Sequence, residues 1–448
     1  MEKKKVLILT YYWPPGGGAG VQRWLKFVKY MGAFGWDPVV YTAENGEMPV
    51  IDESLQKDVP AGTTVLKTPI WEPYHIYKRF TGRKKDDKIN ASFLNENKPE
   101  AGTKTPLQVA TGLAQKVSVW IRGNFFIPDA RKFWIKPSIA YLDQYIKAHQ
   151  ISHVISSGPP HSMHLIALGL KEKNKGLKWI ADFRDPWTNI DFYEKLMLTG
   201  FADRKHHRQE LSVLNAADLV LSIGESMNRE FIEIYKNGGG KEIGKFKVIT
   251  NGFDSDDLVN GGITKDEKFS MAHIGTLVKD RNAPVLWKVL GRLVKNHTGF
   301  RESLQIKLVG KVDIYVREQI EQAGLTPYVH DISYLPHDEV IKEQQRSKVL
   351  LLLVNQTKNA KGILTGKIFE YMASRVPIIA IGPPDGDLAA ILNKTGSGII
   401  SDFSDEASLE KNILFYFENN LPAIKEIEVD KYSRKELTRQ LCEMLSEL

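Results

Sequence analysis

The chain has 448 residues, of which 42% are hydrophobic and 26% charged, and its net charge is +7. A chain of this length is too long to fold around a single hydrophobic core, so we expect a globular protein with two domains of roughly 200 residues each. No apolar run approaches the ~18 residues of a membrane span, and the single cysteine, Cys442, excludes an internal disulfide. We therefore expect a cytoplasmic protein, because a reducing compartment suits such cysteine usage.

The positive charge is concentrated in residues 67–136, a segment that contains fourteen basic and six acidic residues. Aromatic residues such as Trp71 and Trp120 alternate with the basic ones. This pattern fits either a solvated surface insertion whose aromatics belong to the core or a segment that touches an anionic membrane. Nucleic acid is the least favoured partner, and we expect none.

The predicted elements of the first half are strands and helices in alternation. Strands are predicted at 5–10, 38–42, 153–156, 178–182, 219–223 and 246–250. Helices are predicted at 21–34, 106–122, 137–149, 162–173, 202–215 and 226–236. Residues 44–105 contain many Pro, Gly and Lys residues, and we expect them to be irregular.

A second alternating series follows the turn pair Asn251-Gly252. Its predicted strands are 269–274, 305–309, 328–332, 348–354 and 377–381. Its predicted helices are 283–295, 314–323, 338–345 and 366–373. Residues 386–393, 398–401 and 405–417 complete the domain, and 434–446 form a terminal helix. Alternating strands and helices indicate parallel sheets with right-handed crossovers.

This order predicts an α/β protein with two tandem, doubly wound, Rossmann-like domains. The first is expected at 1–250 with an insertion at about 44–136, and the second at 251–430. The helix at 431–448 is expected to pack back on the first domain. In such folds ligands bind at the carboxyl ends of the strands, so we expect the ligand in a cleft between the domains.

A glycine-rich loop at 13–20 (WPPGGGAG) lies between the first predicted strand and helix. Gly17 and Gly18 would let the backbone approach a phosphate at the helix N-terminus. The spacing is not that of a dinucleotide fingerprint, and Tyr41-Thr42-Ala43 places no carboxylate at the end of the second strand. A plain NAD site is therefore not expected; the alternative is a mobile loop.

Charged residues follow the strand at 178–182, in the order Asp182-Phe183-Arg184-Asp185. Arg184 could neutralise a phosphate or leaving group, and Asp185 or Asp182 could orient an acceptor hydroxyl. A structural Arg–Asp pair is the alternative, because buried charges need partners.

Two histidines lie at the start of the predicted helix at 162–173, which follows the strand at 153–156. His161 or His164 could relay a proton, although for either one a structural role is the more common outcome.

The second domain contains two further loops suited to an anion. Gly275 and Arg281 follow its first strand. The helix that begins at Gly366 carries Lys367 and Glu370 in its first turns, and its N-terminus favours a diphosphate. Lysine adds charge and glutamate adds an acceptor for hydroxyls, so the motif predicts a nucleotide-sugar site. Metal motifs are weak, and we expect no metal.

Together these motifs resemble the group 1 (family 4-like) glycosyltransferases of the two-Rossmann GT-B type. The segments that carry the resemblance are the first strand and glycine loop, 248–254 (VITNGFD), Ile274-Gly275-Thr276, Val309-Gly310, 334–339 (YLPHDE) and 370–379 (EYMASRVPII). The resemblance implies that Glu370 binds ribose hydroxyls and that Lys367, Gly366 and Arg281 hold the diphosphate. It also implies a retaining, metal-independent reaction, and Gly17 and Gly18 near the donor phosphate or acceptor.

The chain departs from the family's usual pattern at three positions. Gly362 stands where a glutamate often touches the sugar, Thr276 where an arginine is usual, and Arg184 where many members have a histidine. We count Thr276 and Gly275 with the donor site because of their position.

The sequence thus predicts a glycosyltransferase that moves a sugar from a UDP- or GDP-linked donor to a glycan or lipid-linked acceptor in cell-surface polysaccharide synthesis. Arg184, Asp185, Arg281 and Lys367 are its candidate catalytic residues, with no cofactor besides the donor substrate. We expect residues 67–136 to contact the inner face of the cell membrane. The alternatives are a nucleotide-sugar epimerase and a non-catalytic nucleotide-sugar-binding subunit.

Overall fold

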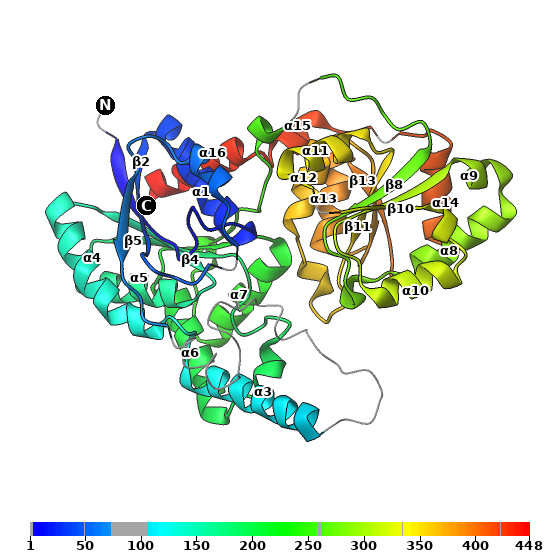
Figure 1. Cartoon of the computed structure of the whole chain (residues 1–448). Coiled ribbons are helices and arrows are strands. Elements are labelled where there is room, and N and C mark those ends of the chain that lie inside the picture. Colours follow the sequence, from blue (N-terminus) through cyan, green and yellow to red (C-terminus); the bar gives the residue numbers. More distant parts are fainter. Residues whose placement is uncertain (1–2, 49, 73–105, 259–260, 334, 422) are drawn as a thin grey trace. The chain divides into compact units, whose positions relative to one another are not determined.

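The computed structural model describes the chain except residues 1–2, 49, 73–105, 259–260, 334 and 422. It divides into two compact units (Figure 1). The first unit comprises Met1–Ile223, Met227–Ile249 and Thr438–Leu448, and the second comprises Gly224–Ser226 and Thr250–Leu437. Much of the predicted basic and aromatic segment, at 73–105, lies outside the described residues.

The first unit is built on a parallel sheet in the order β3-β2-β1-β4-β5-β6-β7. Its strands are β1 (Lys4–Leu9), β2 (Trp36–Ala43), β3 (Thr64–Thr68), β4 (His153–Gly158), β5 (Lys178–Phe183), β6 (Leu219–Ser222) and β7 (Phe246–Val248). The interior strand β1 ends in the apolar run Val-Leu-Ile-Leu and is buried there on both faces, as expected for a parallel sheet covered by helices on both sides.

Helices cover both faces of this first sheet. They are α1 (Ala19–Met31), α4 (Ile135–His149), α5 (Ser162–Lys173), α6 (Gly200–Ala216), α7 (Glu225–Asn237) and α16 (Arg434–Glu447). The remaining helix, α3 (Pro106–Phe125), packs against α6 instead of the sheet. Leu7 and Leu9 of β1 join a core with α4, α5, α6 and α7, whereas Val6 and Ile8 point to the opposite face because strand side chains alternate. Figure 1 shows α1 and α16 on that opposite face.

The second unit has a parallel sheet in the order β10-β9-β8-β11-β12-β13. Its strands are β8 (Phe269–Ile274), β9 (Leu304–Val309), β10 (Val329–Ile332), β11 (Val349–Leu353), β12 (Ile378–Ile381) and β13 (Gly398–Ser401). Its helices are α8 (Pro284–Asn296), α9 (Thr298–Ser303), α10 (Ile314–Gln322), α11 (His337–Arg346), α12 (Gly366–Ala373), α13 (Asp387–Thr395), α14 (Glu406–Phe417) and α15 (Glu426–Asp430).

Two hydrophobic cores sandwich this second sheet. Leu351 and Leu353 of β11 pack in the core that contains α8, α9, α10 and α14. Leu350 and Leu352 pack in the core that contains α12 and α13. An all-leucine run after Val349 therefore serves both faces of one central strand, which confirms the predicted α/β class with doubly wound parallel sheets.

The structure differs from the sequence-based expectation at the edge of the first sheet. Residues 44–105 were expected to be irregular, but β3 lies within them and pairs in parallel with β2. The reason is that β3 is a partly exposed edge strand with the sequence Thr-Val-Leu-Lys-Thr, which lacks the apolar run of a central strand.

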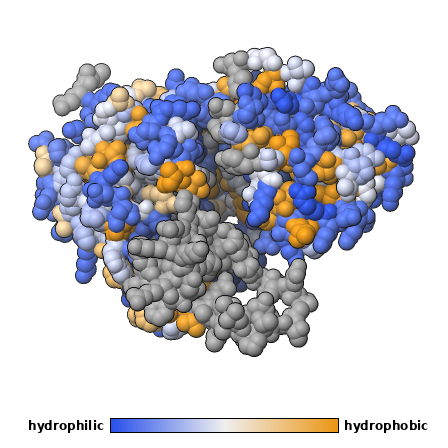
Figure 2. Space-filling model, viewed as in Figure 1, coloured by the Kyte–Doolittle hydropathy of each residue, from blue (hydrophilic) through white to orange (hydrophobic). Residues whose placement is uncertain are grey.

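Figure 2 shows a mostly hydrophilic face with hydrophobic side chains in separate patches. None of the described helices combines the length and apolarity that a membrane span requires.

Candidate functional site

The carboxyl end of β8 meets the N-terminus of α12 in the second unit. Gly275 follows β8 with a φ of +106°, and a Cβ atom at this position would lie 2.6 Å from Lys367 Nζ. Glycine is therefore required twice, for its backbone conformation and for the space that the Lys367 ammonium occupies. Lys367 is the second residue of α12, so two loops from different elements converge on one small cradle.

Two cations share this cradle. Lys367 Nζ is buried and has no hydrogen-bond partner among the residues that the structure describes. Burial, together with the Arg281 guanidinium, lowers the pKa of Lys367 to about 8. Arg281 donates from Nε to Asn355 Oδ1 at 2.9 Å, and burial lowers its pKa too. An anion bound here would relieve both the desolvation and the repulsion between the two cations.

The surrounding side chains fix α12 against β8. Tyr371 accepts a hydrogen bond on its hydroxyl from the Ile274 backbone N–H at 3.2 Å. His273, buried in β8, lies 3.3 Å through Nδ1 from the Leu351 carbonyl oxygen. Burial and the nearby Lys367 lower the pKa of His273 to about 3, so this imidazole is neutral near pH 7 and adds no charge to the cradle.

The structure brings the predicted donor-site residues of the second unit together. Thr276 is exposed, and its carbonyl accepts from Arg281 Nη1 at 3.5 Å. Gly366 is the exposed first residue of α12, where Thr365 provides no side-chain cap. Glu370 is exposed on the same helix. The arrangement presents cations and a helix N-terminus at one end and a carboxylate nearby.

The glycine-rich loop of the first unit is held by the chain after β2. Gly17 donates its backbone N–H to the Val50 carbonyl at 2.9 Å, and a Cβ at Gly17 would lie 2.9 Å from Asp52 Cβ. Gly18 has a φ of +87° with open space beside it. The loop is thus pinned at Gly17 and open at Gly18, just before α1.

Arg184 bonds to the backbone of the start of α1 and of the loop after β4. It donates from Nη1 to the Gly20 carbonyl at 2.8 Å and from Nη2 to the Pro159 carbonyl. The side chain is buried, and burial lowers its pKa. These contacts join the glycine-rich loop to the loop after β4, so a phosphate-binding role for Arg184 stays a prediction. Asp185, the next residue, is exposed at the end of β5.

Asp182 forms a buried ion pair with a residue that sequence reasoning missed. Arg23 of α1 lies 2.8 Å from the Asp182 carboxylate, and both side chains are at most 1% exposed. Trp24 Nε1 and Ser157 Oγ each donate to the same carboxylate at 2.9 Å. The available signal was a charged Arg23 next to Trp24 and one turn before Phe27.

The two histidines after β4 pack among aromatic rings. His161 stacks on Trp187 with ring centroids 4.4 Å apart and planes 2° from parallel. His164 Nδ1 lies 2.8 Å from Ser156 Oγ. Burial lowers the pKa of His161 and lowers that of His164 to about 3. Both rings are neutral packing groups near pH 7, which favours the structural interpretation.

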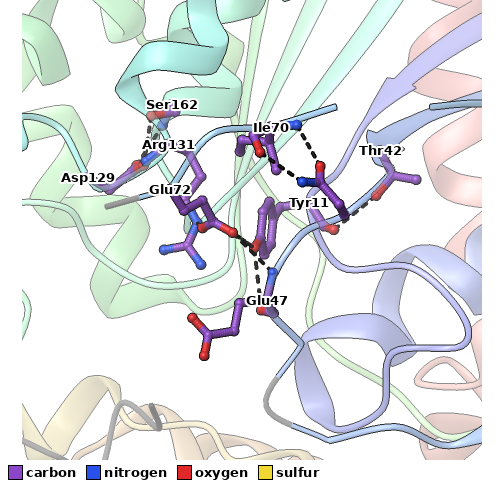
Figure 3. Close-up of polar contacts among 9 residues, drawn as sticks. Tyr11, Thr42, Glu47, Ile70, Glu72, Asp129, Arg131 and Ser162 are labelled. Carbon is purple, nitrogen blue, oxygen red and sulfur yellow. Dashed lines mark hydrogen bonds and ion pairs between the residues drawn. The ribbon is translucent and has the colours of Figure 1, made fainter. Parts of the chain in front are cut away.

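A polar cluster at the end of β1 was also missed (Figure 3). Tyr11 donates its hydroxyl to Glu72 Oε2 at 2.8 Å, and Arg131 Nε lies 2.9 Å from Glu72 Oε1. The Arg131 guanidinium lies 4.4 Å over the Tyr11 ring. Asp129, near Arg131 in sequence, accepts from the Ser162 backbone N–H at 2.9 Å. The cluster joins the loops after β1 and β3 to the start of α5.

Comparisons with known proteins agree with this architecture. Residues 256–436 match the model of the family Glycosyl transferases group 1. No curated protein matches the sequence.

Solved structures match almost the whole chain at low sequence identity. HepE from Anabaena, in complex with UDP-glucose, has a TM-score of 0.56 and 13% identity over 99% of this chain and 100% of that chain. Sucrose-phosphate synthase from Thermosynechococcus elongatus has a TM-score of 0.56 and 11% identity over 99% of both chains. A UDP-N-acetylglucosamine 2-epimerase has a TM-score of 0.50 and 13% identity over 99% of this chain and 96% of that one. These similarities establish the GT-B fold of two α/β units.

Proposed function

We propose that this chain, whose residues 256–436 match the family Glycosyl transferases group 1, transfers a sugar from a nucleoside-diphosphate sugar to a glycan or a lipid-linked acceptor. The donor is UDP- or GDP-linked, and UDP is favoured because HepE, of the same fold, was solved with UDP-glucose. The proposed reaction retains configuration, requires no metal, and serves cell-surface polysaccharide synthesis.

The observation that carries this proposal is the buried ammonium of Lys367. Its Nζ lies over Gly275, beside Arg281, without a hydrogen-bond partner in the described part of the chain. Buried cations are unfavourable unless they are paired, and the N-terminus of α12 adds a preference for an anion at the same place. A diphosphate would accept from Lys367, neutralise Arg281 and bind the N-terminus of α12.

The same cradle suggests how transfer is assisted. As the bond between sugar and diphosphate breaks, negative charge grows on the leaving diphosphate. Lys367 and Arg281 stabilise that charge more than they stabilise the bound donor, which lowers the barrier. Glu370 would hold the ribose hydroxyls. In the first unit, Gly18 and the exposed Asp185 are the residues proposed to meet the acceptor.

Calorimetric titration with UDP tests the donor site. We expect Lys367→Met to weaken UDP binding by about tenfold or more, because a charge-assisted contact with phosphate is lost. Lys411→Met is the matched control, since Lys411 is exposed on α14, and its affinity should equal that of the wild type. Equal affinity for Lys367→Met and the wild type, with both folded, would refute the assignment. A parallel titration with GDP decides between the nucleotides.

Nucleotide-sugar epimerisation is the second candidate, favoured by the likeness to a UDP-N-acetylglucosamine 2-epimerase. Incubation with the donor alone separates the candidates. Epimerised donor supports the second, and slow hydrolysis to free sugar supports transfer. A third outcome, tight binding with neither product, supports a non-catalytic subunit, which Gly362 makes conceivable because a sugar-contacting glutamate is common there in the family.

We further propose that residues 67–136 contact the inner face of the cell membrane. Lipid-linked acceptors would be held at this membrane face.

A further inference from the structure

Helix α3 exposes an apolar stripe to solvent. Val117, Trp120, Ile121 and Phe125 are 48%, 40%, 40% and 58% exposed. Their spacing puts them on one side of the helix. Proteins rarely leave four large apolar side chains together in water without a binding role.

A second element extends this stripe. Asn124 of α3 donates to the Met197 carbonyl at 3.1 Å and accepts from the Thr199 backbone N–H at 2.7 Å. Thr199 in turn caps α6 through the Ala202 N–H. Met197 and Phe201, which are 41% and 70% exposed, are thereby held beside α3.

A third group of rings is joined to the stripe by one lysine. Lys132 Nζ donates to the Phe125 carbonyl at 2.5 Å and lies 4.9 Å over the Phe133 ring. Phe133 packs edge-on against Trp71 at 4.9 Å between ring centroids, and these rings are 44% and 55% exposed. We call the eight exposed apolar side chains the α3 face: Trp71, Val117, Trp120, Ile121, Phe125, Phe133, Met197 and Phe201.

Basic side chains accompany the α3 face on the same elements. The exposed or half-exposed ones are Lys116, Arg122, Lys132, Lys136, Lys195, Arg204, Lys205 and Arg208. In residues 71–72, 116–136 and 193–199 and on α6, the acidic residues are Glu72, Asp129, Glu194, Asp203 and Glu210. Glu72 pairs with Arg131, Asp129 is bonded to Ser162, and Glu210 accepts from Thr188. Positive charge therefore predominates around the apolar side chains.

We propose that the α3 face binds the surface of an anionic lipid bilayer. Trp and Phe side chains enter the boundary between headgroups and acyl chains, and surrounding Lys and Arg side chains attract anionic headgroups. A protein partner would need a complementary acidic surface with its own apolar centre, whereas a bilayer offers charge and apolar depth together. This surface includes Met197, Phe201 and the basic side of α6, beyond the segment that the sequence singled out. This inference rests on the membrane contact proposed above for residues 67–136 and names the side chains that make it; it does not depend on sugar transfer.

Co-sedimentation with vesicles tests the proposal, using the full chain without any sugar donor. We expect binding at low salt to vesicles in which about a quarter of the lipid is phosphatidylglycerol, weakening as salt rises. Neutral phosphatidylcholine vesicles should bind far less. The double variant Trp120→Ser/Phe201→Ser should bind phosphatidylglycerol vesicles about tenfold or more weakly, because two buried rings are lost.

Ile427→Ser is the matched control, because Ile427 is 78% exposed on α15 of the second unit; it should bind as the wild type does. Absence of wild-type binding to phosphatidylglycerol vesicles would overturn the proposal, as would equal losses in the double variant and the control. The proposal would also be overturned if the wild type forms a dimer without vesicles and the double variant is monomeric. The α3 face would then bind a second copy of this chain. Calorimetry with UDP on the same variants keeps this outcome separate from failure of the donor site.

Discussion

The surroundings of Lys367 indicate the charge of the ligand that this side chain would bind. Its ammonium is enclosed by Gly275 and faces Arg281, so the unliganded protein holds a cation in a place that disfavours cations. The same burial and repulsion that lower its pKa to about 8 favour an anion at this place, and the proposed anion is a diphosphate.

UDP binding should therefore depend on pH in a defined direction. A diphosphate favours charged Lys367, so binding raises the pKa of Lys367 above about 8 and takes up a proton at pH ~9. We expect affinity to fall by up to about tenfold per pH unit above pH 8. Calorimetry in buffers of different ionisation enthalpy measures the uptake, and Lys367→Met should abolish it. Uptake that persists in this variant would point to another group.

In the protein without ligand, the stability contributed by Lys367 changes with pH in the opposite direction to the UDP affinity. Unfolded Lys367 titrates near the ordinary lysine pKa of 10.5, whereas the pKa of folded Lys367 is about 8, so between these values the unfolded state holds more protons. The contribution of Lys367 to the free energy of unfolding therefore rises with pH across that window.

Gly275→Ala should damage both stability and UDP binding. At a φ of +106° a side chain is strained, and the new Cβ would displace Lys367 Nζ. We expect about 1–3 kcal/mol of destabilisation. Gly324→Ala is the control, since Gly324 has a φ of +73° and open space; it should share the strain but keep the UDP affinity. Denaturant unfolding and calorimetry report the two effects, and intact UDP binding in Gly275→Ala would contradict the close contact.

At the scale of elements, the first unit is fastened by buried polar contacts between segments far apart in sequence. Arg23 ties α1 to Asp182 of β5, while Arg184 ties the start of α1 to the loop after β4. Tyr11, Glu72 and Arg131 do the same for the loops after β1 and β3.

Asp182→Ala should destabilise the first unit strongly. It leaves the Arg23 guanidinium buried beside an empty position, which costs about 3–5 kcal/mol. Lys147→Ala removes an exposed pair with Asp143 and should change the free energy of unfolding by about 0.5 kcal/mol or less. Denaturant unfolding of both variants provides the comparison. A loss below about 1 kcal/mol for Asp182→Ala would mean that water reaches Arg23.

At the scale of the whole molecule, the sequence predicted what depends on local pattern. The apolar runs of β1 and β11 identify buried parallel strands on their own, and the sequence around Gly366 identifies a helix N-terminus with a cation. β3 escaped prediction because an edge strand needs no continuous apolar run. The partners of Arg184 and Glu72 escaped it because they depend on how distant loops meet, which no short segment encodes.

The membership of α16 bears on how the chain is made. Residues 438–448 belong with residues 1–223 and 227–249 in the first unit, although residues 250–437 build most of the second unit in between. During synthesis residues 250–437 are therefore translated before the last segment of the first unit exists. The first unit cannot be completed until residues 438–448 have been made, although the rest of it is translated first.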